Sequence, residues 1–144
     1  LDVQDAFLRE LSAPTVVNSV VDDLVYLKRG GRISALTATF GKLLNIKPMI
    51  SIMPDGSLQS VGKIKGAKRV FSEFIRIMHE HNCNVRDYRV EVLQADCPET
   101  GDAFIRALKE EFGDGLQIDY QIVGPVIASH CGPGTLGLIF YGDK

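Results

Sequence analysis

Strand-like and helix-like segments alternate along most of this chain, and that alternation limits its possible folds more than any other feature. Residues 15–21 are rich in β-branched side chains, which favour strands. Apolar residues between 67 and 81 recur at the spacing of an amphipathic helix. Strands that exchange with helices of about ten to fifteen residues are typical of a layered α/β fold.

The same patterns predict the remaining elements. Helices are expected at 6–11, 24–28, 34–44 and 98–112, and strands at 49–53, 58–61, 88–93, 116–123 and 136–141. Two of these strands flank Pro54-Asp-Gly-Ser57, and an Asp-Gly pair readily adopts the positive φ angles of a tight turn. The resulting β-hairpin makes the sheet mixed rather than wholly parallel. We therefore predict one α/β domain over residues 1–144, a layered mixed sheet flanked by helices.

Composition narrows the class of protein. The 144 residues are 45% apolar and 24% charged, so a core can form without disulfides or structural metals. The net charge is −2 and basic residues are sparse outside 63–69, which argues against a nucleic-acid partner. No apolar run approaches about 18 residues and the first residues lack a basic leader, so we expect no stable membrane insertion and a cytoplasmic location. The first residue is not Met, so we expect a processed product, an engineered sequence or a piece of a longer protein.

Three cysteines, Cys83, Cys97 and Cys131, are an odd number at unrelated spacings, which predicts reduced thiols. His79, His81 and Cys83 fit no zinc spacing, and we interpret them as a helix end rather than a metal site. The sequence has no phosphate loop, dinucleotide fingerprint or nucleophile elbow, so no cofactor is expected.

Arg32 is the first candidate site residue. It follows Gly30 and Gly31, where we expect uncovered backbone NH groups, and it precedes a predicted helix. This combination suits an anionic group such as a carboxylate or phosphate. On the spacing alone, a helix stop followed by a surface arginine is the preferred explanation, because short glycine-containing motifs often match by chance.

His130 is the second candidate. It lies in the glycine-rich segment 124–134, where we expect a strand-like apolar stretch followed by a turn. An imidazole held there can orient or protonate an oxyanion near neutral pH. The alternatives are a hydrogen-bonded structural histidine and an acyl-transfer or hydrolase enzyme that uses Cys131 or His130. In an extended segment neighbouring side chains point to opposite faces, so His130 would not accept the Cys131 proton directly.

Three segments, 21–34, 41–48 and 124–137, resemble the DegV family in this order. They contain Tyr-Leu-Lys-Arg-Gly-Gly-Arg-Ile-Ser, Gly-Lys-Leu-Leu-Asn-Ile-Lys-Pro and Gly-Pro-Val-Ile-Ala-Ser-His-Cys-Gly-Pro-Gly, and the resemblance covers nearly the whole chain. DegV-like proteins are bacterial, two-lobed and bind fatty acids, and some present the lipid to a separate kinase subunit. The resemblance implies that this chain is the C-terminal lobe of such a protein and that the first lobe is absent from it. It also implies a noncatalytic role for the chain.

The resemblance also implies that Arg32 and His130 face the carboxylate of a long-chain fatty acid, while the hydroxyl contacts of the first lobe are missing. Cys131 departs from the family pattern, which more often carries Thr there. The helix that starts just beyond Arg32 provides our predicted walls for an acyl tunnel, Ile33, Leu36 and Phe40, although ordinary core packing also explains them. The sequence does not fix the oligomeric state.

Overall fold

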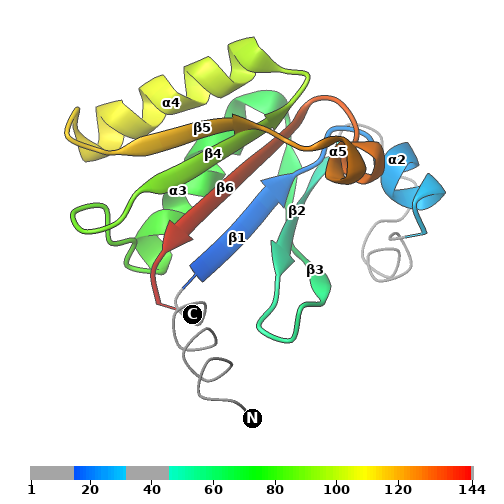
Figure 1. Ribbon diagram of the computed structural model, residues 1–144, viewed down its shortest axis with the longest axis horizontal. Helices are drawn as coiled ribbons and strands as arrows, with labels where there is room; N and C mark the ends of the chain where they lie inside the picture. The colour runs from blue at the N-terminus through cyan, green and yellow to red at the C-terminus, as the bar shows by residue number, and fades with distance from the viewer. Residues whose placement is uncertain (1–14, 32–45, 144) are drawn as a thin grey trace.

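Six strands form one mixed sheet in the computed structural model, which describes residues 15–31 and 46–143 (Figure 1). The strands are β1 Thr15–Val20, β2 Ile46–Ile52, β3 Leu58–Lys65, β4 Val90–Ala95, β5 Ile118–Ile122 and β6 Thr135–Tyr141. They lie in the order β3-β2-β1-β6-β4-β5. Only β4 and β5 pair in parallel, and the other neighbours in this sheet are antiparallel. The predicted α/β class and mixed sheet are confirmed.

The predicted hairpin is also confirmed, because β2 and β3 pair antiparallel across the turn. The amide of Met53 donates to the carbonyl oxygen of Ser57 at 2.8 Å. Gly56 has φ +82°, a conformation that glycine adopts without strain. The Asp-Gly pair therefore acts as the sequence predicts.

Four helices and one 3₁₀ turn connect the strands within the described ranges. They are α2 Leu24–Arg29, η1 Ala67–Arg69, α3 Val70–Glu80, α4 Pro98–Phe112 and α5 Pro125–Cys131. None of these helices is long and apolar enough to cross a membrane. The predicted helices at 6–11 and 34–44 lie outside the described residues.

The main core lies between the sheet and the helices α3 and α4, and α3 lies behind the sheet in Figure 1. Strand residues alternate between faces, so Val16 and Val20 of β1 point into this core. Phe74 and Phe104 are fully buried there, with ring centroids 5.1 Å apart. Each fully buried side chain of this size contributes about 1.5–3 kcal/mol to folding.

The alternate residues lie on the opposite face of the sheet. Val17 of β1 and Ile139 of β6 are cross-strand partners there, and both are half-buried. Helices α2 and α5 pack together at one end of the sheet (Figure 1). A second cluster of buried residues lies at this end: Val21, Leu27, Ile50, Ala95 and Cys131. We call it the end cluster.

Helix α5 contradicts the prediction of a strand-like stretch before His130. The residues that suggested a strand, Val126 and Ile127, are instead 73% and 65% exposed. Pro125 begins the helix, where its fixed φ is favourable and its missing NH is not needed. Gly132 ends it with φ +79°. The local start and stop signals therefore outweigh the β preference of two residues.

Candidate functional site

The contact between α2 and α5 positions His130. Asp23 caps the N-terminus of α2, where its carboxylate accepts a hydrogen bond from the amide of Val25 at 2.8 Å. Gly30 caps the C-terminus. A Cβ atom on Gly30 would lie 2.1 Å from Nδ1 of His130. Only a residue without a side chain lets the imidazole approach this backbone so closely.

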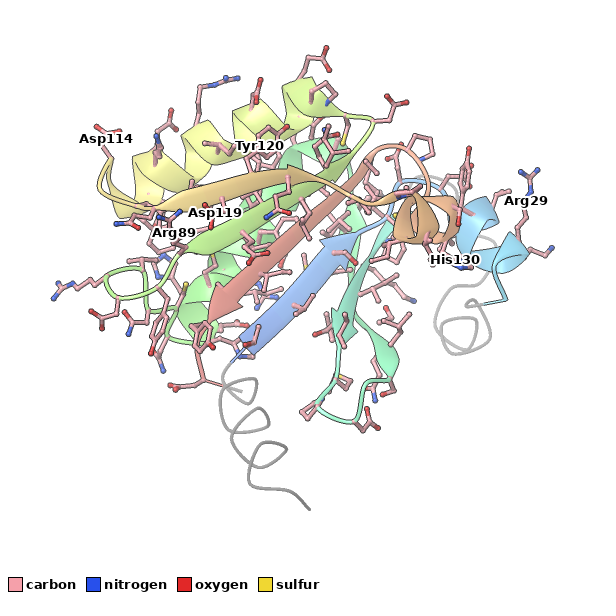
Figure 2. All side chains as sticks on the ribbon, in the orientation of Figure 1. Arg29, Arg89, Asp114, Asp119, Tyr120 and His130 are labelled. Carbon is pink, nitrogen blue, oxygen red and sulfur yellow. The ribbon has the colours of Figure 1, made fainter. Side chains whose placement is uncertain are left out.

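A second contact of the same kind runs in the other direction. A Cβ atom on Gly132, directly after α5, would lie 2.4 Å from the ring of Tyr26 on α2. The glycine that follows each helix thus lies against a ring from the other helix. The two close approaches fix how α5 presents His130. Figure 2 labels His130 where α5 lies beside α2.

The imidazole of His130 carries an unsatisfied polar atom. Its Nδ1 is buried and has no hydrogen-bond partner among the residues that the structure describes. Leaving a buried polar group unpaired costs about 1–3 kcal/mol. Nδ1 accepts in one neutral tautomer and donates in the other tautomer and in the charged form, so it can bind an anionic oxygen when protonated. An unpaired buried atom of this kind is a reason to expect a ligand.

The other predicted site residues fall outside the described ranges. Arg32 and the predicted tunnel residues Ile33, Leu36 and Phe40 all belong to the segment 32–45, so their convergence with His130 stays a prediction. The described chain reaches Gly31, one residue before Arg32. The expectation of uncovered NH groups at Gly30 and Gly31 is wrong, because they donate to the carbonyl oxygens of Tyr26 and Lys28 at 2.9 and 3.1 Å at the end of α2.

Cys131 is buried at 8% exposure at the end of α5. Its sulfur lies 4.0 Å from the carbonyl oxygen of Ala128 and 3.9 Å from that of Gly132. The argument that His130 and Cys131 point to opposite faces assumed an extended backbone and is wrong, because neighbouring residues on a helix are about 100° apart. The thiol nevertheless lies against backbone carbonyl groups, which are not general bases.

His79 of α3 and His81, which directly follows this helix, lie far from this contact in the sequence and have other partners. Nε2 of His79 pairs with Glu111 at 2.7 Å, and Nδ1 of His81 pairs with the carbonyl oxygen of Asp143. Within residues 15–31 and 46–143, no group of three His, Cys, Asp or Glu side chains is arranged to hold a metal ion.

Sequence reasoning missed two features of the site. It read Gly30 only as a helix stop, whereas Gly30 is also the surface on which His130 packs. It also did not identify the half-buried apolar pair of Val17 and Ile139 on the sheet face opposite α3. Apolar residues fall at both odd and even positions within 15–21 and 136–141, so no alternation in the sequence marks this pair.

Comparison with known proteins gives a consistent result. A family model described as an uncharacterised protein of the DegV family matches residues 6–143. A DegV domain-containing protein from Clostridium perfringens is 36% identical over 124 residues, which cover 85% of this chain and 42% of that protein.

Solved structures agree with these matches. A DegV family protein from Thermus thermophilus, described as fatty-acid binding, is 30% identical with a TM-score of 0.76 and covers 99% of this chain and 51% of its own. The fatty acid kinase B3 protein of Streptococcus pneumoniae, solved with linoleic acid, has a TM-score of 0.80 at 18% identity, which shows a shared fold; the match covers 99% of this chain and 50% of that one. The chain thus spans about half the length of these proteins.

Proposed function

Because the chain belongs to the DegV family, we propose that it forms one half of a fatty-acid site in which His130 and Arg32 bind the carboxylate. The observation that carries this proposal is the buried, unpaired Nδ1 of His130. A carboxylate oxygen is the acceptor that a protonated imidazole prefers, and a charge-assisted hydrogen bond contributes about 1.5–3 kcal/mol.

Chain connectivity supports the participation of Arg32. Gly30 is the residue on which His130 packs, and Arg32 follows it by two positions. Two residues of chain span at most about 7 Å, and the arginine side chain adds further reach. A guanidinium group and an imidazole that approach from α2 and α5 would bind the two oxygens of one carboxylate.

We further propose that the acyl chain follows the sheet face opposite α3. The end cluster near α2 and α5 contains Ile50, and Val17 and Ile139 form a half-buried apolar pair further along β1 and β6. The six residues of β1 extend about 20 Å at ~3.3 Å per residue, enough for a long acyl chain. Each buried methylene contributes about 0.8 kcal/mol, so the tail dominates affinity and the head group sets direction. Ile33, Leu36 and Phe40 remain our predicted residues for the opposite wall.

In this proposal the chain is a carrier and not an enzyme. The orientation of the bound fatty acid matters for such a carrier, because a separate kinase subunit would need to reach its carboxylate end. The description of the Streptococcus pneumoniae protein as a fatty acid kinase B3 protein is compatible with that role. The enzyme alternative lacks a specific observation in its favour, since the Cys131 sulfur lies against the carbonyl oxygens of Ala128 and Gly132.

Native mass spectrometry of protein produced in bacteria tests the proposal, both as this chain and in a two-lobed form. We expect a bound acyl chain in the two-lobed form and roughly 10-fold or greater loss of palmitate affinity in His130→Gln. His79→Gln is the matched control, because His79 is 57% exposed and pairs with Glu111. A lipid-free protein in both forms, or equal affinity in the two variants, would contradict the proposal.

A further inference from the structure

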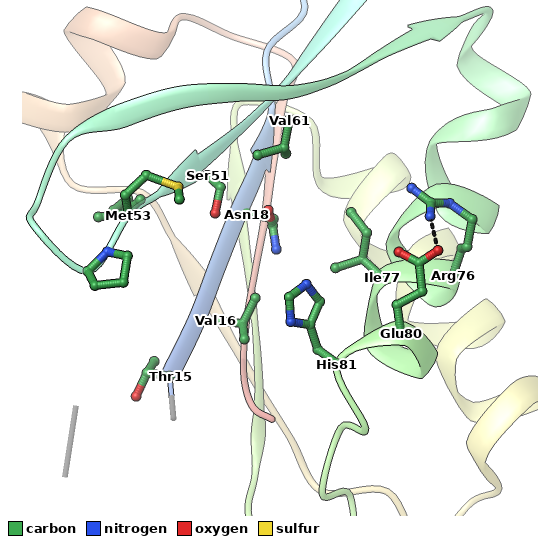
Figure 3. Close-up of a pocket in the computed structure, with 12 residues that line it drawn as sticks. Thr15, Val16, Asn18, Ser51, Met53, Val61, Arg76, Ile77, Glu80 and His81 are labelled. Atoms are coloured by element: carbon green, nitrogen blue, oxygen red, sulfur yellow. Dashed lines mark hydrogen bonds and ion pairs between the residues drawn. The ribbon is translucent and has the colours of Figure 1, made fainter. Parts of the chain in front are cut away.

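A cavity of about 280 Å³ lies on the other side of the sheet, between β1, β2, β3 and α3. Figure 3 shows the side chains around it. Its walls are mainly apolar and include Val16, Met53, Val61 and Ile77. His130 is not among its lining residues, so this cavity is separate from the contact between α2 and α5.

Asn18 supplies an unusual polar group to this apolar space. The residue is only 3% exposed, and it lies in the middle of β1 on the same face as Val16 and Val20. No described residue forms a hydrogen bond with its side-chain amide. The hydroxyl of its cross-strand partner Ser51 donates instead to the carbonyl oxygen of Val17 at 3.1 Å. Among the described residues the fully buried unpaired side-chain atoms are Ser57 Oγ and His130 Nδ1, so the Asn18 amide is reached from the cavity, where a bound molecule can pair with it.

The amide points into the cavity. In Figure 3 the side chains of Asn18 and His81 project toward one another from β1 and from the end of α3. The Nδ1 atom of His81 is already paired with the carbonyl oxygen of Asp143. Asn18 is therefore the group best placed to recognise a polar atom of a guest molecule.

The charged side chains at the rim, Arg76 and Glu80, are already paired with each other, and each is about half-exposed to solvent. Arg76 donates to Glu73 at 2.7 Å and also pairs with Glu80, so its guanidinium group is held by two carboxylates. These hydrogen bonds raise the pKa of Arg76, Glu73 being the larger cause. A charged guest would lose hydration without gaining an ion pair, which favours an uncharged one.

We propose that this cavity is a second ligand site, for a small uncharged molecule with an apolar body and one primary amide or similar group that both donates and accepts. The side-chain amide of Asn18 has a carbonyl oxygen and an NH₂ group, so it pairs with such a group through two hydrogen bonds. The apolar walls bind the body of the molecule by the hydrophobic effect. This inference does not depend on the fatty-acid proposal.

Benzamide is a suitable probe, with toluene and benzoate for comparison, in NMR titrations of the 144-residue chain. We expect saturable shifts of the Asn18 side-chain NH₂ resonances with benzamide, and at least ~10-fold weaker binding of toluene and benzoate, which corresponds to about 1.4 kcal/mol. Asn18→Leu should weaken benzamide binding at least ~10-fold and leave toluene binding unchanged or stronger. Asn18→Ala provides a second variant if the leucine does not fit.

Gln121→Leu is the control, since Gln121 is an exposed amide on β5 and should not affect benzamide binding. Absence of saturable benzamide binding would overturn the proposal. Equal affinity in the Asn18 variants would also overturn it. Competition between palmitate and benzamide would show that the cavity belongs to a fatty-acid site, and would overturn the assignment of a separate one.

Discussion

The backbone of Gly30 and the imidazole of His130 lie in direct contact, so close that a Cβ atom on residue 30 would come within 2.1 Å of Nδ1 and 3.0 Å of the Cε1 carbon. Gly30 has φ −76° and ψ −2°, a conformation that any L-residue adopts without strain. The need for glycine at this position therefore comes from the ring and not from the backbone.

Gly30→Ala should displace the His130 ring and weaken palmitate binding about 10-fold or more, while the free energy of unfolding changes by about 1 kcal/mol or less. Calorimetric titration with palmitate and urea unfolding measure the two effects. Gly115→Ala is the control, because a Cβ there meets no atom within 4 Å. Unchanged binding in Gly30→Ala would mean that the position of His130 is not important for the lipid.

Val17→Thr tests the proposed path of the acyl chain along the sheet face opposite α3. Threonine keeps the β-branched shape but introduces a hydroxyl group, and an unpaired hydroxyl facing an acyl chain costs about 1–3 kcal/mol. We expect roughly a 5- to 100-fold loss of palmitate affinity with little loss of stability. Val61→Thr on β3 is the comparison, since Val61 is 48% exposed and lines the cavity on the other face. Equal effects of the two changes would contradict the path.

Cys131→Ser tests the enzyme alternative. Because the Cys131 sulfur is buried against the carbonyl oxygens of Ala128 and Gly132, we expect no turnover of an activated acyl ester by either the wild-type chain or the variant. Release of the leaving group, followed by absorbance, measures this. Turnover that disappears in Cys131→Ser while palmitate binding persists would favour an acyl-transfer enzyme over a carrier.

The Cys83 thiol predicts a specific pH dependence of stability. Burial raises its pKa from 9.0 to about 11. Above about pH 9 the unfolded chain loses this proton while the folded chain keeps it, so the free energy of unfolding should fall between about pH 9 and 11. Urea unfolding across this range should show a shallower fall in Cys83→Ala. Identical slopes in the two proteins would rule out a contribution from Cys83.

Much of the fold follows from local patterns in the sequence. The hairpin depends on an Asp-Gly turn, and α4 depends on Pro98 at its start and Gly113 at its end, so each is set by adjacent residues. The segment before His130 was predicted incorrectly, because Val126 and Ile127 favour strands in general, whereas this helix is fixed by Pro125 and by its packing on α2.

The site was less accessible to sequence reasoning. His130 could be nominated from its glycine-rich surroundings, but its contact with Gly30 joins residues one hundred positions apart. Asn18 is one polar residue in a segment rich in β-branched side chains, and the sequence analysis did not single it out. Its importance depends on which strand partners and helix surround it, and a single sequence does not state that.

A crystal structure of the two-lobed protein with palmitate tests the central claim most directly. The account predicts carboxylate oxygens within about 3.2 Å of Nδ1 of His130 and of the Arg32 guanidinium group, with the tail extending past Val17 and Ile139. A carboxylate bound away from His130, or an Arg32 side chain directed away from it, would contradict the account.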